Sequence, residues 1–533
     1  MTSGYDIVIL GGGASGCVLA NRLSRDPQRN VLLIEAGPVD RHPMIHMPKG
    51  VGKVLADPAH VWAYPVRAGE GDNRPPKPWL RGRVLGGSSS VNGMMYVRGQ
   101  PADFDAIAEE TSADWNWSQI GRVYREIEDH ALGGGDGRGT RGMLGISLPP
   151  ADNPAMEALI ASGSAVGLAA VEDFNAPADR DRIGYCPQTI RDGRRQSAAA
   201  AFLKPALNRP NLTVRTGLTI DRILFDGTRA IGVEVRDANG IARIDGSRII
   251  VSAGTFGSPA ILERSGVGDA NLLGALGIAC VADRPEIGRN LREHCGLTLQ
   301  WRLKPGTSRN AQYSGWRVLW NGLRYYLTRG GPLAIATFEV GAAFHTHPDA
   351  PRPNAQLLAV PHSLDRSKAT MAMEPFPGMQ MVVYPLRPRA IGEVHITSAD
   401  PFVLPDATLD FFGDPRDRVE LVDTVRAVRK LVAADPIAEL VVEETRPGVQ
   451  VEDDNQILDA YRDMGIPAYH AAGTCRMGSD AASVVDPLTR VRGVEGLHVV
   501  DLSIAPQIPS GNTFAPVVAM AWRAAELIDR EGL

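Results

Sequence analysis

The sequence predicts a mixed α/β fold, α+β overall, with two domains of different architecture. The chain has 533 residues, which is more than one hydrophobic core usually organises. Near its start, an apolar strand, a glycine-rich turn, a helix and a second strand follow one another, as in a parallel sheet that binds a dinucleotide. Far along the chain, MQMVVYPLRP, PDATLDF and EVHITSADP predict strands that suit an antiparallel sheet with one face toward a pocket.

The first unit consists of two buried strands with a helix between them. Residues 5–10 (YDIVIL) are mostly apolar and rich in β-branched side chains, which is typical of a buried parallel strand. Residues 17–26 (CVLANRLSRD) predict a short amphipathic helix, and residues 31–37 (VLLIEAG) predict the second strand. This order of strand, turn, helix and strand is the context that a phosphate-binding glycine motif requires.

The turn of this unit contains the motif Gly11-x-Gly13-x-x-Gly16, which predicts dinucleotide binding. The first glycine permits a tight turn, the second lets the backbone approach a pyrophosphate, and the third lets helix and strand pack closely. Ala14 and Ser15 lie where the helix begins. Free N–H groups and the positive end of the helix dipole at this point attract phosphate.

The second strand ends at Glu35, 19 residues after Gly16, where the carboxylate can accept hydrogen bonds from a ribose hydroxyl. A nicotinamide domain usually continues through alternating strands and helices, whereas this chain leaves that pattern after Glu35. Residues 82–99 (GRVLGGSSSVNGMMYVRG) then form a second Gly/Ser-rich loop. Its N–H groups and hydroxyls suit another part of a large cofactor. A surface linker is the alternative, but the apolar VNGMMYV places the loop beside a core.

Five sequence blocks resemble the glucose-methanol-choline (GMC) family of FAD-dependent oxidoreductases. They run in the family's order between residue 5 and about residue 528, and they are too long to match by chance. The blocks are GRVLGGSSSVN with Tyr96, Gly99 and Asp105 at the family's spacing, GTFGSP (254–259) running to SGVG (265–268), PEIGRNLREH (285–294), YHAAGTCRMG (469–478) and DLSIAPQIPSGNTFAP (501–516).

This resemblance implies an FAD-binding domain assembled from three separate segments and a substrate domain assembled from two. The FAD-binding domain would comprise residues 1–155, 203–298 and 464–533. The substrate-binding domain, with its mainly antiparallel sheet, would comprise residues 156–202 and 299–463. Beyond the first glycine motif, the implied cofactor-binding residues are Val84, Gly87, Ser88, Asn92, Ile220, Asp501, Asn512 and Thr513.

The resemblance also implies where several of these residues contact FAD. Asp501 ends a predicted strand, GLHVVDLSIAP, and resembles the aspartate that binds the ribityl or pyrophosphate group. The backbone of Ile220 would face adenine, and Thr513 would lie at the pyrimidine edge of the flavin. Some relatives attach FAD covalently through a histidine at the position of Val91. Valine cannot form that bond, so we expect noncovalent FAD, held in part by Asn92.

His470 and Asn512 are the expected catalytic residues. Alcohol oxidation removes a hydroxyl proton and a hydride, and an imidazole is a suitable base near neutral pH. The resemblance places His470 opposite the flavin, and the small residues that follow it in YHAAGTCRMG would leave room for substrate. Asn512 would hydrogen-bond the substrate oxygen as negative charge develops. The alternative for Asn512 is the N-cap of a helix beginning near Ala515.

The sequence therefore predicts FAD-dependent oxidation of a small alcohol to an aldehyde or ketone, with hydride transfer to flavin N5. A quinone-like acceptor or O2 would reoxidise the flavin. Two alternatives stay open. One is a hydroxynitrile lyase, a class that resembles this family and keeps FAD without redox turnover. The other is an NAD-dependent dehydrogenase that uses the first glycine motif alone.

Several other features offer no second site. His345 and His347 would share one face of a strand, but no Cys, Asp or Glu cluster completes a metal site, so no metal is expected. We expect Cys475 to be a buried packing residue instead of a nucleophile. Residues 314–331 (SGWRVLWNGLRYYLTRGG) predict a helix in the core or over the pocket, instead of a membrane anchor. The histidines expected to be structural or on the surface are His294, His362, His395 and His498.

Composition limits the possible partners and location. The formal net charge is −5 and the lysines and arginines are scattered, so no nucleic-acid partner is expected. The five cysteines are far apart and never in a C-x-x-C pair, which argues against a disulfide framework and favours a reducing cytoplasm. Neither a signal peptide nor a transmembrane span is predicted, and peripheral membrane association stays open.

Overall fold

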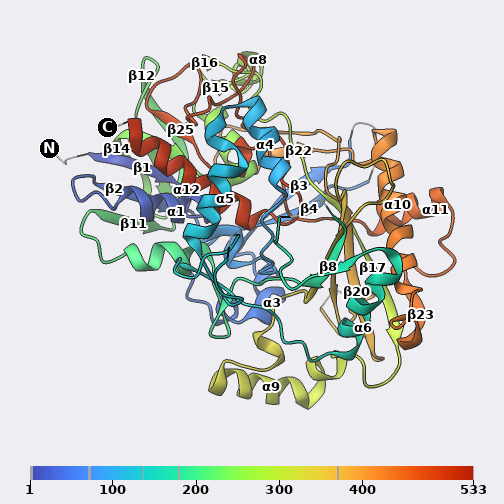
Figure 1. Cartoon of the computed structure of the whole chain (residues 1–533). Helices are drawn as coiled ribbons and strands as arrows, with labels where there is room; N and C mark the ends of the chain where they lie inside the picture. The colour runs from blue at the N-terminus through green and yellow to red at the C-terminus, as the bar shows by residue number, and fades with distance from the viewer. Residues whose placement is uncertain (1–3, 70–73, 136, 178–179, 369–370, 532–533) are drawn as a thin grey trace.

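The computed structural model describes residues 4–69, 74–135, 137–177, 180–368 and 371–531 (Figure 1). Within these ranges the strands form a seven-stranded sheet, an eight-stranded sheet, a four-stranded sheet and three two-stranded pairs. The seven-stranded sheet lies at the end of the molecule that carries both termini, and the eight-stranded sheet lies at the opposite side. The mixed α/β fold expected from the sequence is confirmed.

The seven-stranded sheet is the one that the first glycine motif follows. Its order is β11-β2-β1-β14-β13-β12, and β25 pairs with β14. The strands are β1 (Tyr5–Leu10), β2 (Val31–Glu35), β11 (Leu212–Thr216), β12 (Thr219–Asp226), β13 (Arg229–Asp237), β14 (Gly240–Val251) and β25 (Leu497–Val499). β14 changes partners along its length, since its first half pairs antiparallel with β13 and its second half pairs parallel with β1 and β25.

The parallel part of this sheet gathers several strand ends at one edge. Leu10 at the end of β1 pairs with Ile34 of β2 and with Val251 of β14. Val251 pairs in turn with Val499 of β25. The turns that follow β1, β2, β14 and β25 therefore meet at the carboxyl edge of the sheet, which is where open α/β sheets bind their ligands.

Helices from both ends of the chain cover this sheet. α1 packs against β1, β2 and α12, and α12 also packs against α5, as Figure 1 shows in blue, red and cyan. β2 is wholly buried, so this is the centre of the largest core. The helices are α1 (Ala14–Leu23), α2 (Pro43–His46), α3 (Val51–Leu55), α4 (Pro101–Glu110), α5 (Trp117–Ile127), α6 (Pro154–Ser162), α7 (Gly254–Arg264), α8 (Ala270–Ala275), α9 (Gly315–Thr328), α10 (Pro415–Val432), α11 (Asp454–Met464) and α12 (Phe514–Glu531).

The eight-stranded sheet has the order β23-β17-β20-β19-β18-β8-β7, and β24 pairs with β17. Its pairings are antiparallel except for that between β7 and β8. Helices α6, α10 and α11 pack against it in the second core. The strands are β7 (Ala169–Ala170), β8 (Arg182–Tyr185), β17 (Cys295–Leu303), β18 (Val340–Phe344), β19 (Ala355–Val360), β20 (Gly378–Pro385), β23 (Val441–Arg446) and β24 (Ile466–Pro467).

Two of the three strands expected to share one antiparallel sheet lie elsewhere. β21 (Glu393–His395) and β22 (Asp406–Thr408) join β3 (Val61–Arg67) and β4 (Lys77–Gly82) in the four-stranded sheet. β22 pairs parallel with β3, so a segment from far along the chain is bound to one near its start. Only β20 joins the large sheet, and all eight of its residues are buried. The two-stranded pairs are β5 (Glu128–His130) with β6 (Leu144–Ile146), β9 (Ile190–Arg191) with β10 (Arg194–Arg195), and β15 (Val267–Gly268) with β16 (Ala282–Asp283).

The helix expected to lie in the core or over the pocket is mostly exposed. Helix α9 forms as predicted, but only Asn321 and Tyr325 among its residues are buried. Trp316 is 70% exposed and Leu319 is 75% exposed. Within the described ranges, no helix is both long enough and apolar enough to span a bilayer. The predicted division into an FAD-binding and a substrate-binding domain stays a prediction.

Candidate active site

The turn after β1 is shaped for close approach of a ligand to the backbone. Gly11 has a φ of +111°, and a Cβ on Gly16 would lie 1.9 Å from the carbonyl oxygen of Gly11. A Cβ on Gly13 would have only the Ser252 carbonyl oxygen, at 3.8 Å, as a neighbour. No side chain caps the first turn of α1, where Ala14 and Ser15 begin the helix. The buried Ser15 hydroxyl has no hydrogen-bond partner among the described residues, so both hydroxyl and N–H groups suit a phosphate.

The second Gly/Ser-rich loop packs directly on the first. The N–H of Gly86 donates to the carbonyl oxygen of Gly12 at 2.7 Å. A Cβ on Gly87, whose φ is +54°, would lie 2.7 Å from the Cα of Gly13. Val84 is completely buried, whereas Ser88 is exposed and its hydroxyl accepts the N–H of Gly82. The surface-linker alternative is therefore wrong, because the loop packs on the turn after β1 at the carboxyl edge of the sheet.

A buried arginine that sequence reasoning missed holds this second loop. Arg195 is 2% exposed, and it donates to the carbonyl oxygens of Ile45, Ser89 and Asn92. Its Nη1 also donates to Oδ1 of Asn92 at 2.7 Å. Burial lowers the pKa of Arg195 to about 9. Nothing in the local sequence separates this arginine from the surface arginines beside it, so only the fold reveals it.

The two acidic residues expected at the cofactor anchor backbone turns. Glu35 accepts the N–H groups of Gly12 and Gly37, each at 2.8 Å, and burial raises its pKa to about 7. Asp501 accepts the N–H of Gly254 and the hydroxyl of Ser258. Carboxylate oxygens accept more than one hydrogen bond, so both groups keep capacity for a ligand. β25 ends before the expected position, and Asp501 instead caps the short 3₁₀ helix Leu502–Ile504.

Ile220 lies in β12, and Thr513 lies just before α12. Ile220 is in β12 beside a register shift, and its carbonyl oxygen lies 3.4 Å from Nη2 of Arg264. Thr513 immediately precedes α12, and its carbonyl oxygen accepts the N–H of Val517. The open space at Gly13 and the unpartnered Ser15 hydroxyl fit a bound pyrophosphate, with adenine and flavin contacts left as predictions.

The loop that carries His470 is fastened to the same edge of the sheet. The Thr255 hydroxyl, at the start of α7, donates to the carbonyl oxygen of Ala471 at 2.7 Å. The Thr474 hydroxyl donates back to the carbonyl oxygen of Thr255 at 2.6 Å. Tyr469 has a φ of +65°, an uncommon conformation for a residue with a Cβ that often marks a functional site. The backbone is thus constrained on both sides of the His470 side chain.

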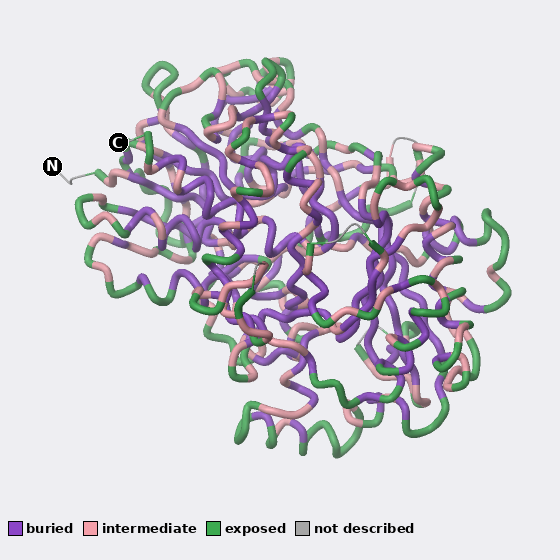
Figure 2. Tube along the Cα trace, viewed as in Figure 1, coloured by how far each residue is buried: buried purple, intermediate pink, exposed green. Residues whose placement is uncertain are grey.

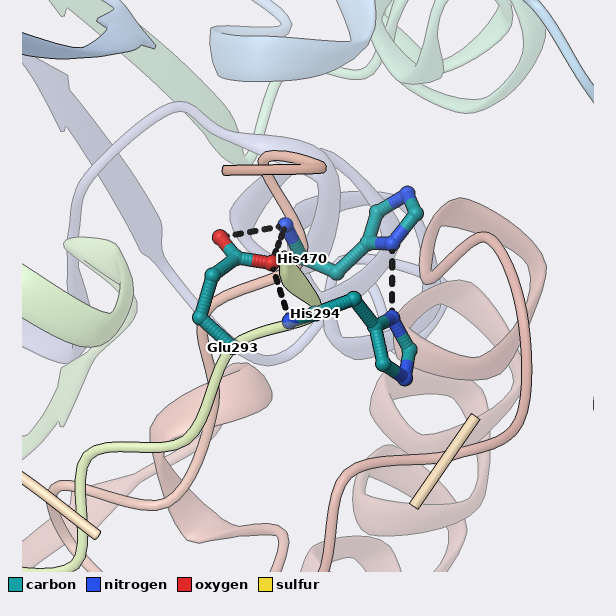
Figure 3. A group of neighbouring side chains, drawn as sticks. All are labelled: Glu293, His294 and His470. Atoms are coloured by element: carbon teal, nitrogen blue, oxygen red, sulfur yellow. Dashed lines mark hydrogen bonds between the residues drawn. The ribbon is translucent and has the colours of Figure 1, made fainter. Parts of the chain in front are cut away.

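Figure 3 shows that a second histidine, His294, lies against His470. Nδ1 of His294 is 2.9 Å from Nδ1 of His470, and Nε2 of His294 is 2.9 Å from the Leu386 carbonyl oxygen. The Glu293 carboxylate accepts the backbone N–H groups of both histidines at 2.8 Å. Sequence reasoning placed His294 among the structural or surface histidines. Its position at the end of the block PEIGRNLREH was the available signal.

The hydrogen-bond partners fix the tautomers of both rings. The Leu386 oxygen can only accept, so Nε2 of His294 carries a hydrogen and Nδ1 of neutral His294 carries a lone pair. Nδ1 of His470 must then donate to that lone pair. Nε2 of neutral His470 is consequently unprotonated. The free lone pair of His470 is thus assigned to Nε2.

Asn512 lies at this unprotonated nitrogen. Its Nδ2 is 3.1 Å from Nε2 of His470, and its Oδ1 accepts from Nε2 of Gln356 at 3.1 Å. Gln356 also donates to the Tyr384 hydroxyl at 2.9 Å. The side chain of Asn512 therefore faces His470, with no capping bond to α12. These side-chain contacts favour a role for Asn512 beside His470 over a role as the N-cap of α12.

Burial sets the charge states in this cluster. His470 is 6% exposed, and burial, followed by His294 and Arg81, holds its pKa well below the ordinary value of 6.5. Burial lowers the pKa of His294 to about 4. Both imidazoles are therefore neutral at neutral pH, as the tautomer assignment requires. Burial raises the pKa of Glu293 to about 7, opposed by Arg81, whose Nη2 is 3.4 Å from Oε2 of Glu293.

The residues set aside from the sequence have other partners. Burial raises the pKa of the Cys475 thiol well above its usual range, so the reactive thiolate does not form readily. Nδ1 of His345 contacts Oδ1 of Asp181 at 2.5 Å. Glu293, His294 and His470 lie close enough to share a metal ion. However, Nδ1 of each histidine is already bonded to the other, and the Glu293 carboxylate already accepts the backbone N–H of His470.

Comparison with known proteins matches this chain to one family of oxidoreductases. Residues 5–296 and 388–521 match the N- and C-terminal GMC oxidoreductase families. The chain is 34% identical to an alcohol dehydrogenase [acceptor] of Pseudomonas putida, over 99% of this chain and 96% of that protein. It is 34% identical to the mitochondrial choline dehydrogenase of Homo sapiens, over 98% of this chain and 89% of that protein.

A solved structure shares the whole architecture. Pyridoxine 4-oxidase from Mesorbium loti superposes with a TM-score of 0.88 at 30% identity, covering 99% of each chain. Fold, site and relatives together define a flavin-dependent oxidoreductase. The chain belongs to the GMC oxidoreductase family. That family binds FAD, and this chain is an FAD-dependent oxidoreductase acting on alcohols, with nothing in the comparisons favouring a lyase.

Proposed function

We propose that His470 is the base that removes the hydroxyl proton of the alcohol and that Asn512 holds the hydroxyl oxygen. The observation that carries this proposal is the unprotonated Nε2 of His470 facing Nδ2 of Asn512 at 3.1 Å. A base and a hydrogen-bond donor side by side are what a hydroxyl group needs on its two sides. A substrate hydroxyl would donate to Nε2 and accept from Nδ2, replacing the bond between the two side chains.

The neighbours of His470 prepare it for this step. Its Nδ1–H bond to His294 keeps the lone pair on Nε2, and its low pKa keeps the ring unprotonated before substrate arrives. Gln356 orients the Asn512 amide so that Nδ2 faces the hydroxyl. When bound, FAD supplies the group that accepts the hydride from the alcohol carbon. A quinone-like compound or O2 is the proposed electron acceptor.

The residues that would hold FAD lie along the carboxyl edge of the seven-stranded sheet. We propose that Gly11, Gly13 and the first turn of α1 contact the pyrophosphate, with Glu35 at a ribose. Val91 is buried with Ile45, Val54 and Val84 in a small apolar cluster. It offers no nucleophile to the flavin, which supports noncovalent binding.

We further propose that the substrate is a neutral alcohol. Positive charge reaches this site from two arginines. The charge of Arg81 acts to lower the pKa values of His470 and Tyr469, and the charge of Arg366 acts to lower the pKa of Tyr469. The carboxylate near these residues belongs to Glu293, which is buried, accepts two backbone N–H groups and forms an ion pair with Arg81. A cationic alcohol such as choline would meet positive charge without a free carboxylate to offset it.

A cytoplasmic location is part of the same proposal. The five cysteines are unpaired, and Cys17, Cys186, Cys295 and Cys475 are buried thiols. Burial raises the pKa of each of these four thiols. Unpaired thiols suit a reducing compartment.

Anaerobic flavin reduction tests the base assignment. Purified enzyme is mixed without air with neutral primary alcohols, aryl carbinols, polyols and choline, and flavin absorbance at about 450 nm is followed. His470→Ala should keep its yellow colour and lose about 10²–10⁴-fold in the reduction rate constant, the usual scale for a general base. His345→Ala, which removes a histidine bonded to Asp181, is the matched control. Reduction of His470→Ala at the wild-type rate would refute the assignment.

A further inference from the structure

Helix α9 carries an apolar face that points away from the protein. Six of its seven large exposed hydrophobic residues follow the spacing i, i+3, i+4, i+7, i+10 and i+11, and each of the six is at least 50% exposed; the seventh, Val318, is 38% exposed and lies off this face. At 100° per residue this spacing covers an arc of about 120° along the helix. These residues, named here the α9 face, are Trp316, Leu319, Trp320, Leu323, Tyr326 and Leu327.

The opposite side of the same helix attaches it to the body. Asn321 and Tyr325 are the buried residues of α9, and they lie about 180° from the centre of the α9 face. Asn321 donates to the Gln312 carbonyl oxygen, and the Tyr325 ring packs with Met47 and Leu333. The Tyr325 hydroxyl contacts the carbonyl oxygens of His46 and Gly193. The helix is therefore held by a narrow side with two buried residues, while its wider apolar face is exposed, the reverse of an ordinary surface helix.

The charged residues on helix α9 are all positive. Residues 310–338, which include α9, contain three arginines and no lysine, aspartate or glutamate, in a chain whose net charge is −5. Three exposed arginines, Arg317, Arg324 and Arg329, lie on α9 or at its end. Within the described ranges none of the three forms an ion pair, and Arg317 and Arg329 rest against aromatic rings of the helix. Positive charge beside an exposed aromatic and leucine-rich face matches an anionic lipid surface.

The position of α9 in the molecule allows such contact. Figure 1 shows α9 at the outer edge of the molecule, far from the seven-stranded sheet and both termini. Figure 2 shows that the chain at this edge is mostly exposed. A helix at an edge can meet a flat surface without obstruction by the rest of the body. From the face, the charges and the position together, we propose that α9 docks this enzyme on a membrane rich in anionic lipid.

In the docked state α9 lies parallel to the membrane surface. Its apolar face enters the boundary between headgroups and acyl chains, and its arginines contact lipid phosphates. The sequence prediction set membrane anchoring aside for this segment, because a helical pattern does not reveal which face meets solvent. This docking rests on α9 alone and is independent of the roles proposed for His470 and Asn512.

Vesicle cosedimentation of the FAD-loaded enzyme tests the proposal. Phosphatidylcholine vesicles are compared with vesicles that also contain phosphatidylglycerol. The wild type should bind the anionic vesicles, and the double variant Leu319→Gln, Leu327→Gln should lose at least about tenfold in partition coefficient. The matched control Phe402→Gln, Val449→Gln removes comparably exposed side chains elsewhere and should bind like the wild type. Because all four positions are exposed, flavin absorbance and alcohol oxidation should remain at wild-type levels.

A second pair of variants separates charge from apolar contact. Arg317→Gln with Arg324→Gln should lower binding to anionic vesicles about tenfold and leave weak binding to neutral vesicles unchanged. Sedimentation equilibrium is run on the same proteins to test a second copy as the occupant of the α9 face. A wild-type dimer that becomes a monomer in the leucine variant, without vesicle binding, would overturn the proposal. Equal binding of anionic vesicles by the wild type and by the double variant Leu319→Gln, Leu327→Gln would overturn it as well.

Discussion

The imidazole of His470 depends on its neighbour for the position of its hydrogen. In sequence the two histidines are 176 residues apart, and in the fold their Nδ1 atoms are 2.9 Å apart. The ring nitrogens of His294 contact His470 and the Leu386 carbonyl oxygen, and we treat His294 as a positioning residue. Its effect is to leave Nε2 of His470 as the available base.

Replacement of His294 should therefore slow flavin reduction without loss of the cofactor. In His294→Ala the Nδ1 hydrogen of His470 loses its acceptor, and a share of the molecules should carry the hydrogen on Nε2 instead. We expect a rate constant about 10- to 100-fold lower, measured anaerobically by stopped flow. His294→Gln, whose amide oxygen can accept the same hydrogen, should recover part of the rate. An Ala variant with wild-type rate and an unshifted pH profile would contradict the tautomer assignment.

The pH dependence of flavin reduction should reveal the low pKa of His470. The base is active when unprotonated, and burial holds its pKa well below 6.5. As pH falls, the reduction rate constant should therefore stay level through 6.5 and decline only at lower pH. An exposed histidine would instead lose half its activity near pH 6.5. Single-turnover reduction between pH 5 and 8 measures this limb, and a midpoint at or above 6.5 would contradict the assignment.

At the scale of elements, two glycine-rich turns form one surface. The turn after β1 and the loop that contains Gly87 touch at backbone distance, since a Cβ on Gly87 would lie 2.7 Å from the Cα of Gly13. Arg195 fixes the second loop through three hydrogen bonds to Ser89 and Asn92, and a fourth ties it to the Ile45 carbonyl oxygen. The carboxyl edge of the sheet is therefore a joint between segments far apart in sequence.

Gly87→Ala should disrupt this joint. Its φ of +54° costs an alanine roughly 1–2 kcal/mol, and the added Cβ also collides with Gly13. We expect reduced FAD content after purification, measured as the absorbance ratio of flavin to protein. Gly227→Ala is the matched control, because Gly227 has a φ of +57° with no atom within 4 Å of its Cβ position. Equal FAD loss in both variants would attribute the effect to backbone strain alone.

The sequence predicted local elements better than their partners. β1 has the predicted residues, and α1 and β2 follow close to the predicted ranges, because apolar periodicity and a glycine turn are local signals. The pairing of β22 with β3 joins segments more than 300 residues apart, and no local pattern encodes it. The outward apolar face of α9 could not be predicted either, since periodicity defines a face without saying what covers it.

In the candidate site, too, the sequence predicted residues that lie in distinctive motifs and missed those whose role depends on contacts in the fold. Family motifs identified His470 and Asn512, whose side chains the fold brings to 3.1 Å. Arg195, Gln356 and His294 act through three-dimensional contacts and lie in unremarkable local sequence or at the end of a motif. Reasoning from one sequence finds the residues whose motifs are distinctive and misses those that orient them.

For the whole molecule, the proposed noncovalent binding would make the cofactor separable from the chain. Val91 lies in an aliphatic cluster, with no nucleophile at that position. Denaturation in guanidinium or acid followed by ultrafiltration should release all the yellow colour into the filtrate, identified as FAD by its chromatographic mobility. A covalent relative treated in parallel keeps its flavin on the protein. Flavin absorbance that stays with the denatured chain would contradict noncovalent attachment.

The pairing of β25 with β14 and the packing of α12 on α1 also bear on how the protein is made. The half that would grip the nucleotide lacks a strand and a covering helix until residues near position 530 leave the ribosome. Stable loading of FAD at the proposed site therefore requires β25 and α12 to have been synthesised, and until then a nascent chain exposes an unpaired edge of β14.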